Sequence, residues 1–262
     1  MANFKTIWLS DVHLGSTGCQ AEILYHFLDN SNSDNLILVG DIIDFWALRR
    51  KAYWPQTHNN VVQKVLKKAK KGTKVIYIPG NHDETLRDYL SYTFGSIEMH
   101  REYIYESISG RSILCLHGDD FDVVTRYHKW IARLGDVGYD FLLLLNRHFN
   151  AIRAKMGVGF WSLSAFIKHK VKQAVNFIGD YEENVAKEAK LRNVDAVLCG
   201  HIHHLNMSYN ETLYMNTSDW VETCGGIVEH FDGTIETFTY NIHTGMTIHH
   251  RLLPNSNEVE IV

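Results

Sequence analysis

The stretch LILVGDIID, from Leu36 to Asp44, combines an apolar run with a glycine and two carboxylates. Four consecutive apolar residues before a turn signal predict a short buried strand over Leu36–Val39. Gly40 permits a sharp turn, and Asp41 and Asp44 follow at the carboxyl end of the strand. In open α/β sheets, ligands bind at the edge formed by the carboxyl ends of the strands. This stretch therefore predicts an α/β fold with a polar site at one sheet edge.

Four other segments repeat this design, with metal-binding side chains at the end of a predicted strand. They are Ser10-Asp11-Val12-His13, Gly80-Asn81-His82-Asp83, His117-Gly118-Asp119 and Gly200-His201-Ile202-His203. Alternation along an extended backbone would point residues i and i+2 to the same side. On this basis Asp11 and His13 would present one pair of ligands, and the two histidines of the last segment another. The neighbouring glycines would let the backbone approach a bound phosphate. One such segment alone is typical of capping or solvated polar residues, but five together predict a metal site.

Apolar runs elsewhere predict the rest of the fold, an α/β protein with a mixed sheet. Strands are predicted at Phe4–Leu9, Lys74–Ile78, Ser112–Leu116 and Ala196–Cys199. A closely spaced series, expected to be antiparallel, follows at Leu205–Tyr209, Thr212–Met215, Ile227–Phe231, Thr234–Tyr240 and Met246–Leu252. Apolar residues at helical spacing predict a helix over Asn59–Lys71, ended by Gly72. Asp180 and Glu183 resemble a capping box that starts another helix.

Length and composition limit the class of protein. The 262 residues suit a single domain, and 45% of them are apolar, enough for a core. Lys and Arg number 26 against 30 Asp and Glu, which argues against a nucleic-acid binder. No apolar run approaches the roughly 20 residues that span a bilayer, and Met1–Ser10 is too short before its motif to be a signal peptide. The four cysteines form no CxxC pair, so neither a thiolate zinc site nor a disulfide framework is expected. We therefore expect a cytoplasmic protein.

One stretch, residues 122–178, lacks strand alternation and has a helical pattern. From Phe141 to Ile178 it contains six Lys or Arg and no acidic residue, interleaved with aromatic residues. We expect a helical insertion within a single domain over 1–262. Basic and apolar side chains together suit an anionic lipid or an anionic membrane surface, although packing as ordinary core explains the apolar ones equally well. Lys168, Lys170 and Lys172 are candidate phosphate contacts, or else part of a solvated helix face.

The order of the five motifs, D-x-H, GDxxD, GNHD, HGD and GHxH, resembles that of the calcineurin-like metallophosphoesterases. The resemblance covers the chain outside the insertion and implies an α/β/β/α sandwich of two mixed sheets with a helical lid. It also implies two divalent metal ions, the first held by Asp11, His13, Asp41 and His203, and the second by Asp41, Asn81, His117 and His201. Oxygen and imidazole ligands without thiolate suit Mn²⁺, Fe²⁺, Zn²⁺ or Co²⁺, of which we favour Mn²⁺.

The same resemblance implies hydrolysis of a phosphate ester or anhydride. A pair of divalent cations polarises phosphoryl oxygens and makes hydroxide available near neutral pH. His82 would donate a proton to the leaving oxygen and, with Asn81, contact the substrate. Asp44 would orient His82, or alternatively cap the following turn. Asp119 would orient His117 and lie near the substrate, or simply belong to a turn.

Two features point to a narrower substrate class. The small-residue segment Asn216–Glu222 resembles the corresponding segment of bacterial UDP-2,3-diacylglucosamine diphosphatases, which also carry a helical lid at the position of the insertion. That subfamily cleaves a nucleotide-linked diacyl sugar to UMP and a lipid monophosphate in lipid A synthesis. The resemblance implies a cytoplasmic hydrolase in peripheral contact with the inner membrane surface. The sequence departs from the best-known branch, which has Arg in place of His82 and Glu in place of Asp44.

Two other functions stay open at this point. A His–Asp pair suits a phosphodiesterase or phosphomonoesterase for soluble substrates, including phosphoproteins and cyclic nucleotides, equally well. A non-catalytic binding scaffold of the same fold is the third hypothesis. Such scaffolds generally lack ligands or the histidine of GNHD, and the sequence retains all of them.

Overall fold

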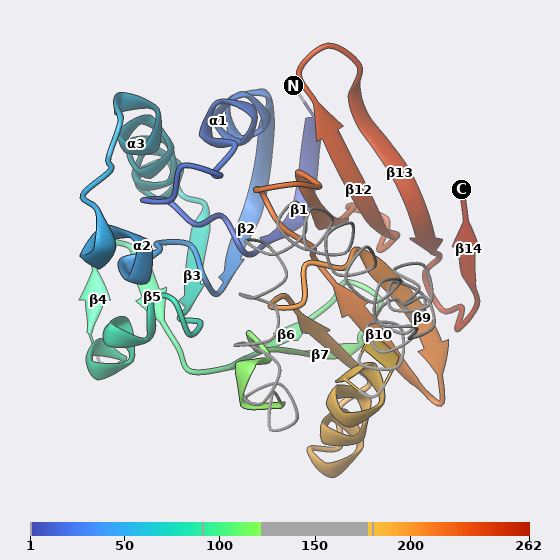
Figure 1. The fold of residues 1–262 in the computed structure, drawn as a ribbon. Coiled ribbons are helices and arrows are strands. Elements are labelled where there is room, and N and C mark those ends of the chain that lie inside the picture. Colours follow the sequence, from blue (N-terminus) through green and yellow to red (C-terminus); the bar gives the residue numbers. More distant parts are fainter. Residues whose placement is uncertain (1, 91, 122–177, 180) are drawn as a thin grey trace, which may run out of the picture. The chain divides into compact units, whose positions relative to one another are not determined.

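The fold consists of two β-sheets with helices packed on them (Figure 1). The computed structural model describes residues 2–90, 92–121, 178–179 and 181–262. The nine-stranded sheet has the order β14 (Val259–Ile261), β13 (Gly245–Leu252), β12 (Ile235–Asn241), β11 (Gly225–Glu229), β1 (Ala2–Leu9), β2 (Ser31–Val39), β3 (Lys74–Ile78), β5 (Ile97–Met99) and β4 (Thr93–Phe94). The five-stranded sheet has the order β6 (Tyr103–Glu106), β7 (Ser112–Cys115), β8 (Ala196–Cys199), β10 (Thr212–Asn216) and β9 (Asn206–Asn210).

Both sheets are mixed, as expected for this α/β fold. In the large sheet β1, β2 and β3 are parallel, whereas β11 to β14 are antiparallel. In the small sheet β7 pairs with β8 in parallel, and β6 and β9 pair antiparallel with their neighbours. The expectation of an entirely antiparallel series after β8 is wrong at one place, because β10 pairs with β8 in parallel. The chain reverses direction from β8 to β9 and again from β9 to β10, so β10 runs in the same direction as β8.

Alternation along β2 shows how the layers are built. Leu36 and Leu38 belong to a core cluster shared with α1 (Ala21–Asn30) and α3 (Gln56–Lys70). Ile37 and Val39 point to the opposite face and join a second cluster with residues of the small sheet, such as Ile113 and Leu198. Each fully buried Leu or Ile contributes roughly 1.5–3 kcal/mol of transfer free energy. The large sheet is therefore sandwiched between helices and the small sheet.

The remaining helices are short or lie late in the chain. They are α2 (Phe45–Arg50), the 3₁₀ helix η1 (Glu84–Tyr89) and a helix over 181–191. Helix α3 begins at Gln56, three residues before the predicted start, directly after Pro55, whose φ of −69° leads into a helix. It ends as predicted before Gly72, which has φ +103°.

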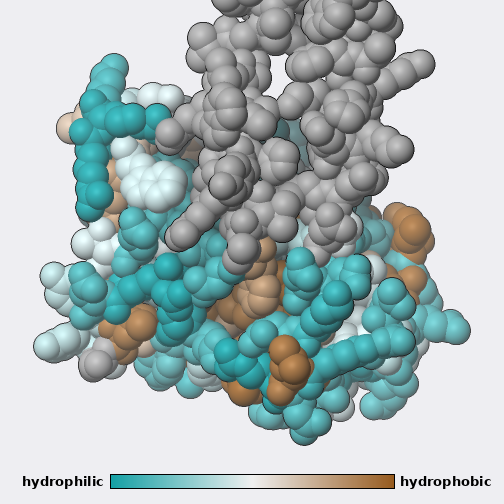
Figure 2. Space-filling view, turned by 60° about the horizontal axis from the view of Figure 1, so that its bottom comes forward, coloured by the Kyte–Doolittle hydropathy of each residue, from teal (hydrophilic) through white to brown (hydrophobic). Residues whose placement is uncertain are grey.

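Most of the predicted insertion lies outside the described residues, and so do Asp180, Lys168, Lys170 and Lys172. The chain divides into two compact units, one formed by 1–119 with 185–262 and the other by 120–184. Among the described helices, none has the length and apolar character needed to cross a membrane. On the face shown in Figure 2, hydrophobic side chains of the described residues form small separate groups among hydrophilic ones.

Candidate metal centre

The five sequence motifs follow five strands of the two sheets. Those with Asp11, Asp41 and Asn81 follow β1, β2 and β3 of the large sheet, and those with His117 and His201 follow β7 and β8 of the small sheet. These strands run in parallel within each sheet, so their carboxyl ends meet at one edge. The second core cluster joins the two sheets face to face and brings the two sets of loops together.

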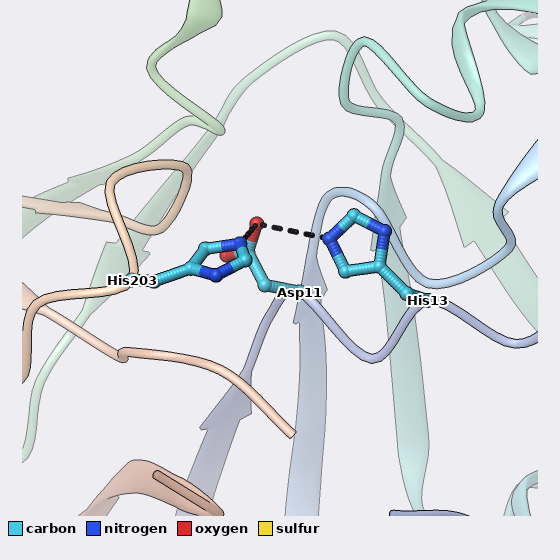
Figure 3. Close-up of side chains that lie close together, drawn as sticks. All are labelled: Asp11, His13 and His203. Atoms are coloured by element: carbon cyan, nitrogen blue, oxygen red, sulfur yellow. Dashed lines mark hydrogen bonds and ion pairs between the residues drawn. The ribbon is translucent and has the colours of Figure 1, made fainter. Parts of the chain in front are cut away.

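Asp11, His13 and His203 form the first cluster, with one ligand atom of each within 4.8 Å of the others (Figure 3). The Asp11 Oδ1 atom lies 3.2 Å from His203 Nε2 and 3.9 Å from His13 Nε2. Asp11 is fully buried and His13 is nearly so, whereas the His203 side chain is 38% exposed. The cluster is therefore open to a ligand on the His203 side.

Asp41, His117 and His201 form a second cluster within the same 4.8 Å limit. The Asp41 Oδ2 atom lies 3.3 Å from His117 Nε2, and both residues are buried. Asp41 also groups with His13 and His82 within 4.8 Å. Asp41 thus links the two clusters, as a carboxylate shared by two cations would.

Several atoms of the predicted ligand residues suit a cation because they are buried without a hydrogen bond. His13 Nε2, Asn81 Oδ1 and His117 Nε2 are buried and have no hydrogen-bond partner among the described residues. Such atoms are rare in protein interiors, where nearly all buried polar atoms are paired. The other ring nitrogen of His117, Nδ1, lies 2.9 Å from the Val39 carbonyl oxygen. A donated Nδ1–H at that carbonyl leaves the lone pair of Nε2 free for a metal ion.

Protonated histidines balance the buried carboxylates of the site, and a cation could take the place of those protons. Burial raises the pKa of Asp11, but His203 and His117 outweigh it and hold the pKa at about 2. Burial lowers the pKa of His117, but Asp41 outweighs it and raises the pKa to about 10. In the same way Asp11 raises the pKa of His203 to about 9. The carboxylates thus hold protons on His117 and His203, and a divalent cation would displace those protons on binding.

The backbone at these ligands differs from the prediction. Asp11, His13, Asp41, His201 and His203 all have left-handed φ values, between 50° and 71°. The prediction of an extended backbone with i and i+2 on one side is therefore wrong. His201 and His203 lie in different clusters, although Asp11 and His13 do lie together. Non-glycine residues in this conformation are uncommon and cluster at functional sites.

The glycines of the motifs make room for the ligand side chains. A Cβ atom on Gly40 would lie 2.2 Å from His117 Nδ1, and one on Gly80 would lie 2.3 Å from Asp41 Oδ1. A Cβ atom on Gly200 would lie 2.3 Å from Ser10 Oγ, next to the Asp11 carboxylate. Since real Cβ atoms do not approach so closely, any other residue there would displace a ligand. The structure thus shows a packing role for glycines that were expected to approach phosphate.

Asp44 caps the helix that follows it and also lies beside two histidines of the site. Its side chain caps α2, accepting a hydrogen bond of 2.7 Å from the Ala47 backbone N–H. Its carboxylate also lies 3.0 Å from His82 Nδ1 and 3.2 Å from His13 Nδ1. Burial opposes the charge, but these partners lower the pKa of Asp44 below its usual range. Asp44 is therefore a buried anion between two histidines of the site.

Asp119 does not orient His117. Its carboxylate oxygens lie 2.8 and 2.9 Å from Arg87 Nη2, whereas His117 Nδ1 is paired with the Val39 carbonyl. Arg87 belongs to η1, which directly follows the GNHD motif, so this ion pair ties two motif loops together. Among the two sequence hypotheses for Asp119, the structural one is favoured.

Sequence reasoning missed Asp83, the last residue of GNHD. Asp83 is fully buried, and its carboxylate accepts hydrogen bonds from backbone N–H groups of the two loops that flank it, 2.6 Å from Gly80 and 2.9 Å from Ile42. It also accepts one of 2.5 Å from the Tyr77 hydroxyl. Asp83 therefore fixes the Asp41 loop against the Asn81 loop. The signal that could have indicated this role is the position of Asp83, an acidic residue at the end of a motif whose other polar residues were assigned to the metal site and the substrate.

The segment Asn216–Glu222 has a supporting role in the structure. Asn216 Nδ2 donates to the Gly200 carbonyl at 2.8 Å, and Thr217 Oγ1 lies 2.6 Å from Ser10 Oγ. Ser10 in turn donates to the Asp11 carboxylate. Asn216 and Thr217 are fully buried. The segment thus holds the Asp11 and His201 loops in place from behind.

Comparison with known proteins gives one family match and distant relatives. The sequence profile described as Calcineurin-like phosphoesterase matches residues 4–205. A UDP-2,3-diacylglucosamine hydrolase of Porphyromonas gingivalis is 28% identical over 138 residues, covering 50% of this chain and 52% of the relative. The chain thus spans about half the length of that curated relative.

Solved structures resemble the chain at low identity. A single mutant of Vps29 from Entamoeba histolytica is 10% identical, with a TM-score of 0.47, covering 94% of this chain and 97% of that chain. A conserved uncharacterised protein of Streptococcus pneumoniae TIGR4, described as a predicted phosphoesterase, is 13% identical, with a TM-score of 0.40 and coverage of 100% and 99%. Wild-type Vps29 of Entamoeba histolytica complexed with Zn²⁺ is 11% identical, with a TM-score of 0.42 and coverage of 94% and 97%.

Proposed function

The chain belongs to the calcineurin-like phosphoesterase family, and we propose that it cleaves the pyrophosphate of UDP-2,3-diacylglucosamine or a similar nucleotide-linked lipid. The products would be UMP and a lipid monophosphate, in lipid A synthesis. One observation carries the hydrolytic part of this proposal. Ligand atoms from five loops converge in three overlapping groups, the atoms of each group within 4.8 Å of one another, and three of these loops hold a buried atom without a hydrogen bond.

Two divalent cations, Mn²⁺ in the first place, would be held by the two clusters. The first would use Asp11, His13, Asp41 and His203, and the second Asp41, Asn81, His117 and His201. When bound, such ions polarise phosphoryl oxygens and favour attack by water on phosphorus. The ligand set of carboxylate, amide and imidazole without thiolate suits Mn²⁺, Fe²⁺, Zn²⁺ and Co²⁺.

His82 would supply the proton for the leaving oxygen. Its side chain is 24% exposed, and its Nε2 atom lies 4.0 Å from Asp41 Oδ2, beside the shared carboxylate. Asp44 lies 3.0 Å from the opposite nitrogen, Nδ1. Asn81 and His82 would thus face the substrate.

The lipid part of the proposal rests on three observations of different kinds. The curated relative is named for UDP-2,3-diacylglucosamine, although the match covers half of each chain. Residues 141–178 contain six Lys or Arg and no acidic residue, and the helical lid that we propose over 122–178, within one domain over 1–262, would offer Lys168, Lys170 and Lys172 as phosphate contacts. No Asp or Glu stands between Asp44 and Asp83, whereas nine Lys or Arg do, in a chain with a net charge of −4.

Part of this basic stretch lies exposed directly beyond the site. Arg50 and Lys51, at the end of α2, are exposed and have no ion-pair partner among the described residues. Tyr53 and Trp54 follow, with exposed fractions of 36% and 42%. Basic and aromatic side chains together suit the surface of an anionic bilayer. We therefore propose a cytoplasmic enzyme in peripheral contact with the inner membrane, with no nucleic-acid partner.

A substrate panel tests the proposal. Purified protein with Mn²⁺ would be assayed on UDP-2,3-diacylglucosamine, UDP-sugars without acyl chains, cyclic nucleotides and p-nitrophenyl esters, with His82→Ala as a matched variant. Release of UMP from the lipid substrate, faster than from the other compounds and enhanced by lipid or detergent, is the expected result. Fast hydrolysis of simple phosphoesters without UMP release would contradict the lipid substrate and support a hydrolase for soluble substrates. Equal results for His82→Ala and the parent on every compound would support a binding scaffold.

A further inference from the structure

We propose that Trp46 is a positioning residue that holds the ring of His82 in line for proton transfer. The inference rests on the proposed function, in which His82 is the proton donor. The indole of Trp46 lies over the imidazole of His82, with ring centroids 4.3 Å apart and ring planes inclined by 35°. Trp46 is half-buried, and no motif of the sequence contains it.

Asp44 by itself does not fix the orientation of the ring. Its Oδ1 atom lies 3.0 Å from His82 Nδ1, yet Nδ1 has no aligned hydrogen bond among the described residues. The same carboxylate also serves His13, at 3.2 Å, and the Ala47 backbone N–H, at 2.7 Å. A carboxylate divided among three partners places a charge next to the ring but leaves the ring free to tilt.

Packing supplies the missing restraint. The rings of His13 and His82 meet edge to face, with centroids 4.6 Å apart and planes inclined by 86°, so His13 blocks rotation of His82 in one direction. Trp46 covers a face of His82 and closes another. With an edge contact and a face contact in place, rotation of the imidazole about its χ2 angle must displace one of the two neighbours.

Trp46 can act in this way because its own position is fixed. It is the second residue of α2, which begins at the cap formed by Asp44. The backbone N–H of Phe45 donates to the His82 carbonyl at 3.2 Å, so the first turn of α2 is attached to the GNHD loop. The helix start, the indole and the imidazole therefore form one connected unit.

The restraint matters at the moment of bond breaking. As the oxygen of water bonds to phosphorus, the P–O bond to the leaving group breaks and its electron pair stays on the leaving oxygen. That oxygen takes the proton from His82 Nε2, which leaves the imidazole neutral. The proton of the attacking water passes to bulk water, and the imidazole later regains a proton from bulk water. Misplacement of a catalytic group by about 1 Å can cost 10²-fold in rate. Leaving groups that are poor bases need this proton least.

The leaving group therefore provides the test. The substrates are the phenyl and the p-nitrophenyl ester of UMP, which differ only in the leaving group. Phenolate is as basic as a tyrosine side chain, with a pKa of about 10, whereas p-nitrophenolate is much less basic. The phenyl ester therefore depends more on the proton from His82. The measured quantity is the ratio of kcat for the p-nitrophenyl ester to kcat for the phenyl ester. We expect Trp46→Ala to raise this ratio about tenfold, with KM little changed, and Trp46→Phe to keep it near the parent value. In a His82→Ala background, Trp46→Ala should change the ratio no further.

Each outcome has a defined meaning. An equal loss on both esters in Trp46→Ala, or a further rise in the His82→Ala background, would overturn the positioning role. If His82→Ala itself leaves the ratio unchanged, the proposed proton donor fails, independently of Trp46. Tyr25→Ala, which removes an exposed aromatic ring of α1, is the control for general loss of stability, and thermal denaturation of every variant verifies folding.

Discussion

Asp83 shows how one buried side chain can organise two ligand loops. Its carboxylate accepts hydrogen bonds from Gly80, Ile42 and Tyr77 while no solvent reaches it. An amide in its place would turn one acceptor into a donor that faces other donors. We expect Asp83→Asn to lower the free energy of unfolding by about 3 kcal/mol in the absence of metal.

Chemical denaturation in a chelating buffer measures this effect without any contribution from metal binding. Asp88→Asn is the matched control, because Asp88 lies exposed in the adjacent helix η1. Equal stability of Asp83→Asn and the parent would show that the carboxylate is not required for the loop arrangement.

Asp41 and His203 differ in the number of metal ions that each would bind. Asp41 takes part in two groups of potential ligands, whereas His203 takes part in one. If the wild-type protein binds two Mn²⁺ ions, His203→Ala should keep about one and Asp41→Asn should keep neither at the same concentration. Elemental analysis after gel filtration gives the ratio, with the exposed His243→Ala as control. Equal metal content in Asp41→Asn and His203→Ala would contradict a shared carboxylate.

Among the elements, α3 carries a titratable group inside the fold. Lys68 is buried, and its ammonium group donates to the Ser31 carbonyl. Burial lowers the pKa of Lys68 from 10.5 to about 8. Between these two values the unfolded chain holds a proton that the folded chain has released, so folding becomes more favourable as pH rises. We expect the free energy of unfolding of the parent to rise relative to Lys68→Met between about pH 8 and 10.5.

Urea denaturation at several pH values in this range measures that difference. Lys70→Met, a change at an exposed lysine of the same helix, is the matched control for the effect of removing a positive charge. A parent-minus-Lys68→Met difference that stays flat with pH would contradict the buried ammonium.

Elements α2 and α3 also allow a test of the proposed membrane contact. Arg50 and Lys51 lie just beyond the site, whereas Lys67 and Lys70 lie in the last turn of α3, a helix of 15 residues and so about 22 Å long. We expect Arg50→Glu with Lys51→Glu to lower binding to phosphatidylglycerol vesicles at least tenfold. Lys67→Glu with Lys70→Glu, the same change in charge, should have a much smaller effect.

Cosedimentation with phosphatidylglycerol and phosphatidylcholine vesicles measures this binding, and hydrolysis of a soluble ester verifies that the site is intact. Equal losses in the two double variants would indicate a general charge effect. No binding of the parent to either vesicle would exclude the membrane contact.

The elements differ in how readily the sequence revealed them. Continuous apolar runs such as Lys74–Ile78 and Ala196–Cys199 predicted strands with the observed bounds, because burial on both faces leaves an unmistakable pattern. The short β4 and β5 were missed, since strands of two or three residues are too short to show an alternating pattern. Helix α1 was missed although Leu24, Phe27 and Leu28 recur at helical spacing, because Gln20 provides no capping side chain to mark its start.

For the whole molecule, the sequence predicted which residues gather but not how they meet. Motif spacing led to Asp11, Asp41, His117 and the other ligand residues, and the structure brings their atoms close together. The left-handed backbone at the ligands could not be predicted, because non-glycine residues seldom adopt it. Contacts such as Arg87 with Asp119 also escaped prediction, since they depend on how separate loops face each other.

The left-handed ligands have a consequence for how the protein can change. Each L-residue held in this region costs roughly 1–2 kcal/mol, and five such positions surround one site. Glycine removes that penalty together with the side chain. In a chelating buffer, His201→Gly, which keeps the backbone N–H donated to Asp11, should therefore melt at a higher temperature than the parent, as measured by calorimetry. A lower melting temperature would show that the contacts of the imidazole outweigh the backbone penalty. If the melting temperature rises, the left-handed residues are kept for catalysis at the expense of stability. A homologue that no longer needed catalysis would then become more stable by replacing these residues with glycine and losing the metal site.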